Sequence, residues 1–236
     1  MESVAEIRGL KKYFNNNLVL DIPELTLRKG LRYAIIGPNG SGKTTLLRIL
    51  AGILLPDEGS ASVSAASAAY MPQKPYAFKL SVLRNVELAV KGKNRRECAL
   101  KALEKVGLHD LHSRRGDSLS GGETQRMAFA RVLADKHDFL LLDEPSSSAD
   151  IASKVKMEEA LNEYIGESPC TLFFSTHVPS QAASLADLII ILDNGRVAEM
   201  GSSEQVLYRP ESDSGRLFLS HWRLGDHKNG GQNAQS

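Results

Sequence analysis

Residues 37–45 place three glycines, a lysine and two threonines in one turn. The turn has the spacing G-x-x-x-x-G-K-[ST], directly after the apolar run 33–36 and before an apolar helical pattern. Glycines let backbone N–H groups converge on phosphate oxygens, and the start of a helix adds positive potential. We therefore expect the turn to bind nucleotide phosphates. The residues expected to form it are Gly37, Pro38, Asn39, Gly40, Ser41, Gly42, Lys43, Thr44 and Thr45.

Two side chains of this turn bring chemistry of their own. The Lys43 ammonium can reach the β and γ phosphates, and the Thr44 hydroxyl can bind magnesium. The alternative is a glycine- and serine-rich turn without a ligand, and the strand and helix patterns on either side argue against it. A phosphate loop alone leaves kinases, GTPases and many ATPases open, and so further motifs must decide between them.

A second glycine-containing motif, LSGGETQR, covers residues 119–126. Ser120, Gly121 and Gly122 precede an amphipathic helical pattern, so their N–H groups and the hydroxyl can form an anion site at a helix N-terminus. A plainer interpretation, that Ser120 is an N-cap, is compatible with this one. The motif predicts a second place for a phosphate.

An acidic pair, Asp143 and Glu144, ends the apolar run FLLLDEP at residues 139–145. Because side chains alternate along a strand, the two carboxylates should point in different directions. This arrangement allows one to hold a metal ion and the other to act on water. The alternative is a solvated strand end without a catalytic role.

The motifs GPNGSGKTT (37–45), LSGGETQR (119–126) and FLLLDEP (139–145) occur in an order and spacing that resemble an ATP-binding cassette (ABC) ATPase, over about residues 4–210. The resemblance implies ATP and Mg²⁺ as cofactors, with Asp143 positioning the metal and Glu144 as the general base. It also implies that residues 120–123 cap the γ phosphate of ATP held by a second cassette. A homodimer or a heterodimer with a similar chain follows. The capping residues are Ser120, Gly121, Gly122 and Glu123.

Further site residues come from the same resemblance. His177, after another apolar run, matches the histidine that contacts the γ phosphate, although a lone histidine there can also be structural. Gln73 matches a glutamine that binds magnesium or water, and a simple turn residue is the alternative. Asp150 matches an aspartate that faces the second cassette. Either Tyr13 or Phe14 stacks on adenine, and the count from Leu10 favours Phe14; the alternative for either is packing in the core.

The expected fold is α/β, a P-loop NTPase (RecA-like) with a mainly parallel sheet, an N-terminal antiparallel β portion and an inserted helical subdomain. Continuous apolar runs indicate strands buried on both faces. They occur at 33–36, 139–142, 171–174 and 188–192. We expect a catalytic core at about 1–72 and 137–222, a helical subdomain at about 73–136, a short strand pair between 58 and 73, and a disordered polar tail at 223–236.

The composition of the chain argues against several classes of function. The 29 Lys and Arg nearly balance the 28 Asp and Glu, so no global field favours nucleic acid. Cys98 and Cys170 are far apart in the sequence, which argues against a disulfide framework or structural zinc. No apolar stretch reaches the roughly 20 residues of a membrane span, and the charged first residues do not resemble a signal peptide. We expect a cytoplasmic protein, peripheral on the inner face of the membrane.

The spacing of about 75 residues between the phosphate loop and LSGGETQR favours a transporter subunit over a chromosome-maintenance ATPase. The expected partners are transmembrane permease subunits, docked beside residues 74–83 through exposed Tyr76 and Phe78, and an external solute-binding protein. The alternative is that those two aromatics belong to the subdomain core. The chain looks most similar to importers of oxyanions such as tungstate, molybdate or phosphate. The alternatives are a soluble ATPase acting on nucleic acid or ribosomes, and a non-hydrolysing regulatory module.

Overall fold

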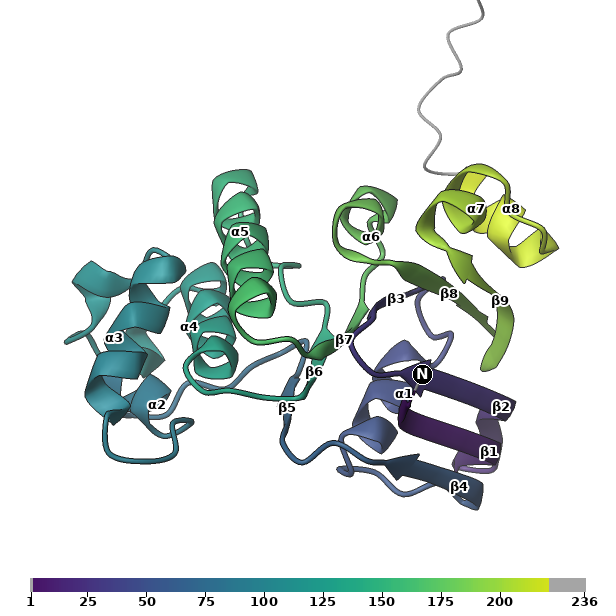
Figure 1. Cartoon of the computed structure of the whole chain (residues 1–236), viewed down its shortest axis with the longest axis horizontal. Coiled ribbons are helices and arrows are strands. Elements are labelled where there is room, and N and C mark those ends of the chain that lie inside the picture. Colours follow the sequence, from purple (N-terminus) through teal and green to yellow (C-terminus); the bar gives the residue numbers. More distant parts are fainter. Residues whose placement is uncertain (1, 221–236) are drawn as a thin grey trace, which may run out of the picture.

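A six-stranded sheet lies at the centre of the computed structural model, which describes residues 2–220 (Figure 1). Five neighbouring strands are parallel, and the last strand at one edge is antiparallel to its neighbour. All four apolar runs that predicted strands are strands of this sheet, which confirms the mainly parallel core. In sheet order the strands are β5 (Ala68–Met71), β6 (Phe139–Asp143), β7 (Thr171–Ser175), β3 (Arg32–Ile36), β8 (Leu188–Asp193) and β9 (Arg196–Ser202).

Successive residues of the central strands face two different cores. In β6, Leu140 and Leu142 pack with the helices on one face, whereas Phe139 and Leu141 pack toward the other face. This alternation is the period of two that a strand imposes. Because both faces are covered, every residue of β6 is buried, which explains its unbroken apolar sequence.

The N-terminal residues form the expected antiparallel portion, a three-stranded sheet in the order β2-β1-β4. Strand β1 (Ser3–Phe14) and β2 (Asn17–Arg28) are joined by a two-residue turn in which Asn15 and Asn16 have φ of 50° and 63°. Asparagine tolerates such left-handed angles, which tight hairpins require. Helix α1 (Lys43–Leu50) contacts β2 and β4 of this sheet and β6 and β7 of the central sheet, so it lies between the two.

The expected strand pair between residues 58 and 73 is wrong. Strand β4 (Glu58–Val63) pairs with β1, and β5 pairs with β6, so the two strands belong to different sheets. The residues that connect the two strands are hydrogen-bonded to both sheets. The Ser64 N–H donates to the Val4 carbonyl of β1. The Asp138 carboxylate, next to β6, accepts from the Ala66 and Ser67 N–H groups at 3.1 and 3.2 Å. Long-range pairing therefore replaces the local hairpin.

Helices occupy the region between β5 and β6, at the end of the molecule labelled α2, α3 and α4 in Figure 1. These are α2 (Val82–Glu87), α3 (Arg95–Lys105) and α4 (Gly121–Leu133), with short 3-10 turns at His109–Leu111 and Gly116–Ser118. No residue of 72–134 belongs to either sheet. The position of these helices agrees with an inserted helical subdomain, whose boundaries at 73 and 136 stay a prediction.

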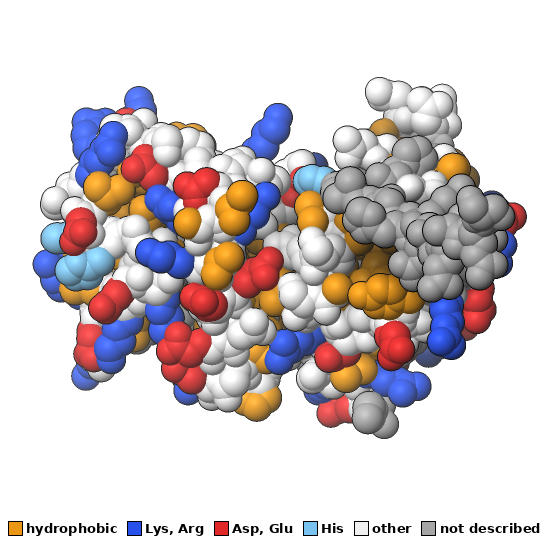
Figure 2. All heavy atoms as spheres, turned by 90° about the horizontal axis from the view of Figure 1, so that it is seen from above, with side chains coloured by type: hydrophobic (Ala, Val, Ile, Leu, Met, Phe, Trp, Pro, Cys, Tyr) orange, Lys and Arg blue, Asp and Glu red, His pale blue; other side chains and the backbone are white. Residues whose placement is uncertain are grey.

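The remaining helices pack on the same face of the central sheet as α4, opposite α1. They are α5 (Ile151–Glu167), α6 (Pro179–Leu185), α7 (Ser203–Tyr208) and α8 (Asp213–Ser220). Within residues 2–220 no helix has both the length and the hydropathy needed to cross a bilayer. On the described part of the face in Figure 2, hydrophobic side chains lie in small groups between charged ones. The predicted tail at 223–236 lies outside the described residues.

Candidate active site

The phosphate loop connects β3 to α1 and approaches other backbone closely. Gly37 has φ of 150°, and a Cβ there would lie 2.1 Å from the Leu192 carbonyl oxygen. Gly42 has φ of 105°, and a Cβ there would lie 2.6 Å from the Leu20 side chain. Glycine is therefore required at both positions, for conformation and for space. The sharp turn directs the following residues toward one hollow.

This hollow has a volume of about 370 Å³, within the range of ligand pockets. It draws residues from β2, the phosphate loop, α1 and the segments that follow β5 and β6. Eight of its nine lining residues are predicted site residues, and Val19 is the addition. The lining residues are Val19, Asn39, Gly40, Gly42, Lys43, Thr44, Thr45, Gln73 and Glu144.

Lys43 forms part of the wall of this hollow and is only 6% exposed. Its Nζ donates to the carbonyl oxygens of Gly37 and Pro38, each at 2.9 Å. Burial lowers the pKa of the ammonium, and the carboxylates of Glu144 and Asp143 offset this in part. Since Lys43 has no ion pair within residues 2–220, its charge is directed to the loop and the hollow rather than to a carboxylate.

The two acids at the end of β6 point to different surroundings, as predicted. Asp143 is 1% exposed; its Oδ1 accepts from the Ser175 hydroxyl at 2.6 Å, while its buried Oδ2 has no hydrogen-bond partner in the described structure. Glu144 instead lines the hollow. Residues 2–220 hold no group of three or more His, Cys, Asp or Glu placed to bind a metal. A hard cation here would therefore need phosphate or water oxygens besides Asp143.

Glu144 is held at its N–H, its carbonyl and its carboxylate. The N–H donates to the Ser175 hydroxyl at 2.9 Å, and the carbonyl accepts from Gln125 Nε2 at 2.9 Å. The carboxylate accepts from Gln73 Nε2 at 3.0 Å, and its Oε2 lies 3.5 Å from His177 Nδ1. These contacts fix a residue whose φ of 46° is unusual for a side chain other than glycine.

Sequence reasoning missed two of these partners. Ser175 had a usable signal, since it is a polar residue at the end of a buried strand beside the acidic pair. Gln125 is 1% exposed and lies on the buried side of α4. A glutamine in an amphipathic helix is usually on the solvated face, and so its position gave no signal.

The helix N-terminus at Ser120 lies apart from the phosphate-loop hollow. The Ser120 hydroxyl accepts from the Glu123 N–H at 3.3 Å, and the Glu123 carboxylate accepts from the Ser120 N–H at 2.7 Å, which is a capping box. These hydrogen bonds lower the pKa of the Glu123 carboxyl. The N-cap interpretation is thus correct. Ser120 and Gly121 are exposed, and no residue of 119–126 lines the phosphate-loop hollow.

Three further predicted residues also lie outside that hollow. Asp150 caps α5 through its carboxylate, which accepts from the Ser153 N–H at 2.7 Å. Tyr13 and Phe14 end β1; the Tyr13 hydroxyl donates to Glu58 at 3.1 Å, while Phe14 is 45% exposed with Lys12 Nζ 5.6 Å from its ring centroid. Neither aromatic is part of the core.

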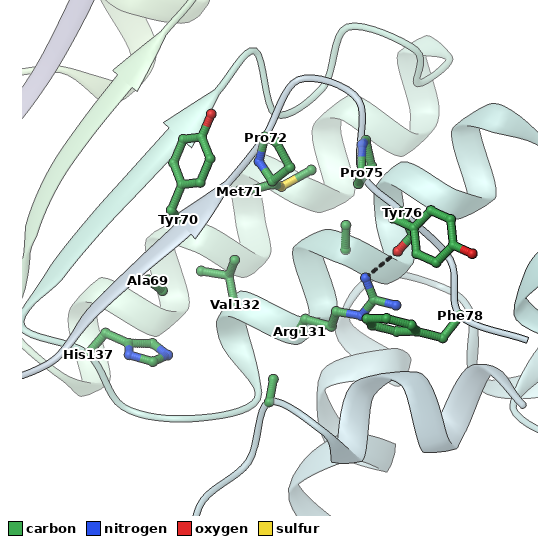
Figure 3. Close-up of a pocket in the computed structure, with 12 residues that line it drawn as sticks. Ala69, Tyr70, Met71, Pro72, Pro75, Tyr76, Phe78, Arg131, Val132 and His137 are labelled. Atoms are coloured by element: carbon green, nitrogen blue, oxygen red, sulfur yellow. Dashed lines mark hydrogen bonds between the residues drawn. The ribbon is translucent and has the colours of Figure 1, made fainter. Parts of the chain in front are cut away.

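A second hollow, of about 410 Å³, is lined by residues of β5, α4 and the segment that follows β5 (Figure 3). Tyr76 and Phe78 line it and meet edge to face, with ring centroids 5.3 Å apart. The Arg131 guanidinium lies over the Phe78 ring and donates to the Tyr76 carbonyl at 2.6 Å. Tyr76 is 65% and Phe78 46% exposed, so these rings do not join the subdomain core, and the prediction that they are exposed is confirmed.

Comparison with known families decides the identity of this site. The protein-family model described as "ABC transporter" matches residues 20–147, more than half of the chain. The chain belongs to the ABC transporter family. The match includes the phosphate loop, LSGGETQR and the acidic pair, and this ABC transporter protein is accordingly an ATP-binding ATPase of the ABC type.

Individual relatives of this ABC transporter protein extend over nearly all of it. It is 36% identical to the phosphate import ATP-binding protein PstB 2 of Natronomonas pharaonis, over 91% of this chain and 85% of the relative. It is 38% identical to the tungstate uptake system ATP-binding protein TupC of Peptoclostridium acidaminophilum, over 82% and 96%. A solved dimeric ATP-binding cassette, in a post-hydrolysis state with ADP and phosphate, superposes with a TM-score of 0.76 at 26% identity, over 84% and 98%.

Proposed function

We propose that this chain is the ATP-hydrolysing subunit of an import transporter and that two cassettes close on two ATP molecules to drive a separate permease. The observation that carries the proposal is the convergence of Lys43, Gln73 and Glu144 on one hollow. The import ATP-binding proteins that are 36–38% identical to it support the transport role. The same relatives do not favour a soluble ATPase acting on nucleic acid or ribosomes.

The hollow fits the phosphates of ATP. Backbone N–H groups of residues 39–45 surround them, and Lys43 adds the positive charge that the β and γ phosphates need. Mg²⁺ fits beside Thr44, Gln73 and Asp143, because Asp143 offers a buried carboxylate oxygen without another partner. When bound, the metal neutralises charge that develops on the phosphates.

Glu144 acts as the general base in this proposal. Its carboxylate accepts a proton from the water that attacks the γ phosphorus, while the bond from that phosphorus to the β-phosphate oxygen breaks to give ADP and phosphate. Gln73 and His177 flank the carboxylate at 3.0 and 3.5 Å and restrict its orientation. His177 also contacts the γ phosphate.

The helix tip at Ser120 completes the site of a second copy. Its exposed N–H groups and hydroxyl face the γ phosphate of the partner's ATP, together with Gly121, Gly122 and Glu123, and Asp150 lies at the same contact. Of the two adenine candidates, Phe14 is favoured because the Tyr13 hydroxyl is engaged with Glu58. Stacking there contributes about 1–3 kcal/mol.

The hollow at Tyr76 and Phe78 receives a helix of the permease. Exposed aromatic rings beside an apolar groove are typical anchors for such a helix. Gln73, three residues before Tyr76, connects this groove to Glu144. The permease holds the chain at the inner face of the membrane, and an external binding protein delivers the solute, an oxyanion such as tungstate.

The test is to purify the chain with its membrane subunits, identify the subunits, and measure ATP hydrolysis in lipid vesicles with tungstate, molybdate, phosphate or sulfonates and the external binding component. We expect an oxyanion to stimulate hydrolysis. Stimulation by an unrelated solute would overturn the oxyanion assignment. Tight RNA binding at physiological salt without membrane subunits would favour the nucleic-acid alternative, and ATP binding without turnover in the full complex would favour a regulatory module.

A further inference from the structure

Gln125 lies where helix α4 meets the segment that follows β6. It is 1% exposed, five residues after Ser120 on the same helix. A buried glutamine costs free energy unless both ends of its amide are hydrogen-bonded. The contacts of this side chain show what offsets that cost.

The amide of Gln125 is matched to three groups of one short segment. Its Oε1 accepts from the Ser148 N–H at 2.6 Å, and its Nε2 donates to the Glu144 carbonyl at 2.9 Å and to the Ser147 hydroxyl at 3.2 Å. An ionised carboxylate at this position would have no donor, and an ammonium group would have no acceptor. The side chain therefore fixes the main chain at both ends of residues 144–148.

Two neighbours on α4 reinforce the same contact. A Cβ at Gly122 would lie 3.0 Å from the Ser148 carbonyl oxygen, so the helix approaches this segment without an intervening side chain. Arg126 donates to the Ser153 hydroxyl at the start of α5. Residues 122, 125 and 126 share one helix face through their spacing of three and four. The helix tip and the segment after β6 thus form one packed unit.

Gln125 is hydrogen-bonded directly to the backbone of Glu144, whose φ is unusual. With φ of 46°, this residue is held at its N–H by Ser175 and at its carbonyl by Gln125. Ser175 belongs to the central sheet, whereas Gln125 belongs to the helix whose tip begins at Ser120. Gln125 is therefore a direct hydrogen-bonded link between that helix and the main chain of Glu144.

We propose that Gln125 is a positioning residue for Glu144, which couples the helix tip at Ser120 to the base of the same chain. The proposal rests on the proposed function, in which the tip contacts the partner's nucleotide. Through Gln125, arrival of one copy's tip at its partner's ATP orients the base for its own ATP. The two nucleotide sites of the dimer are thereby linked.

The first test compares Gln125→Met, which keeps the size and removes every hydrogen bond, with Gln125→Glu, which keeps an acceptor for the Ser148 N–H. Gln205→Met is the matched control, because Gln205 bonds Glu199 far from the site. We expect kcat to fall tenfold or more in both Gln125 variants, with the Kd for a fluorescent ATP analogue within twofold of wild type, since misplaced catalytic groups lower turnover more than binding. A kcat within twofold of the control, or an equal loss of kcat and affinity, would overturn the proposal.

Mixed dimers made from two differently tagged copies test the direction of the effect. The reference pairs a wild-type copy with a Glu144→Gln copy. With Gln125→Met and Glu144→Gln in the same copy, we expect the single-turnover rate of the reference, because the remaining active site keeps its own Gln125. With the two changes in opposite copies, we expect a rate at least tenfold below the reference. The reverse pattern would mean that Gln125 acts only on the partner's nucleotide.

Failure of this inference can be distinguished from failure of the proposed function. If wild type hydrolyses ATP and Glu144→Gln abolishes turnover while the Gln125 variants behave normally, only the positioning role is wrong. If Glu144→Gln leaves turnover unchanged, the proposed mechanism itself is wrong.

Discussion

Two glycine-containing motifs of the molecule, both proposed to bind phosphate, are built differently. The phosphate loop has three glycines at positive φ, a buried lysine and a hollow of about 370 Å³. The tip of α4 has regular N-cap geometry, lies exposed, and is satisfied by its own capping box. The loop can surround a ligand by itself, whereas the helix tip can only add contacts to a ligand that another surface already holds. In the proposed function, the loop is thus the binding site of one chain and the tip is the surface that closes the site of its partner.

The largest expected effect is on the rate of ATP hydrolysis at the phosphate-loop hollow. Glu144→Gln should lower kcat by about 100-fold or more, the size of a general-base contribution, while ATP binding is retained. Steady-state hydrolysis and equilibrium nucleotide binding measure the two quantities. Near-normal turnover would remove Glu144 from the mechanism and leave the hollow as a binding site alone.

Lys43→Ala tests whether the loop binds by itself. Loss of the buried ammonium should weaken ATP affinity by about 10-fold or more, since a charged hydrogen bond contributes about 1.5–3 kcal/mol. Titration of the isolated chain with a fluorescent nucleotide measures this, with Lys29→Ala, an exposed lysine in a surface ion pair, as the control. Unchanged affinity would contradict the phosphate-loop assignment.

Ser120→Ala tests the closing surface. In the Glu144→Gln background, ATP-dependent dimerisation should weaken by about tenfold or more, because the hydroxyl no longer contacts the partner's nucleotide and a hydrogen bond to a charged group contributes about 1.5–3 kcal/mol. Light scattering after gel filtration measures dimerisation. ATP affinity of the single chain should stay unchanged, and a drop in that affinity instead would show that the tip belongs to the binding site of its own chain.

The smallest expected effect concerns the segment that joins α4 to β6, away from both the loop and the tip. The Tyr164 hydroxyl on α5 accepts from the His137 N–H at 2.8 Å and donates to the Asp135 carbonyl at 2.9 Å, just after α4. Tyr164→Phe should lower the free energy of unfolding by about 1–2 kcal/mol through the unsatisfied N–H, with kcat unchanged. Urea unfolding measures it, and an unchanged midpoint would show that water replaces the hydroxyl.

The same tyrosine gives a pH dependence. Burial raises the pKa of Tyr164 to about 12, above its ordinary value of 10. The neutral phenol is thus favoured in the folded chain, so its contribution is complete below pH 10 and is lost as the pH rises toward 12. We expect the stability difference between wild type and Tyr164→Phe to shrink between pH 10 and 12. A constant difference would contradict the raised pKa.

Local sequence patterns predicted the parts of the fold that local physics determines. Buried strands have apolar sequences because both faces of the sheet are covered. The phosphate loop is rich in glycine because a Cβ at Gly37 would collide with the Leu192 backbone and because Gly42 has a positive φ. Strands β4 and β5 were placed wrongly because their partners, β1 and β6, are distant in the sequence. Gln125 was missed for a related reason: only the packing of α4 shows that its polar side chain is buried.

The backbone angle at Glu144 has an evolutionary consequence. A left-handed φ costs a side-chain-bearing residue about 1 kcal/mol or more, and glycine would adopt it freely. Replacement by glycine would therefore relieve strain and discard the carboxylate in one step. Selection for stability therefore favours glycine at position 144, whereas selection for ATP hydrolysis favours glutamate. In a descendant that no longer needs to hydrolyse ATP, we expect this position to change early.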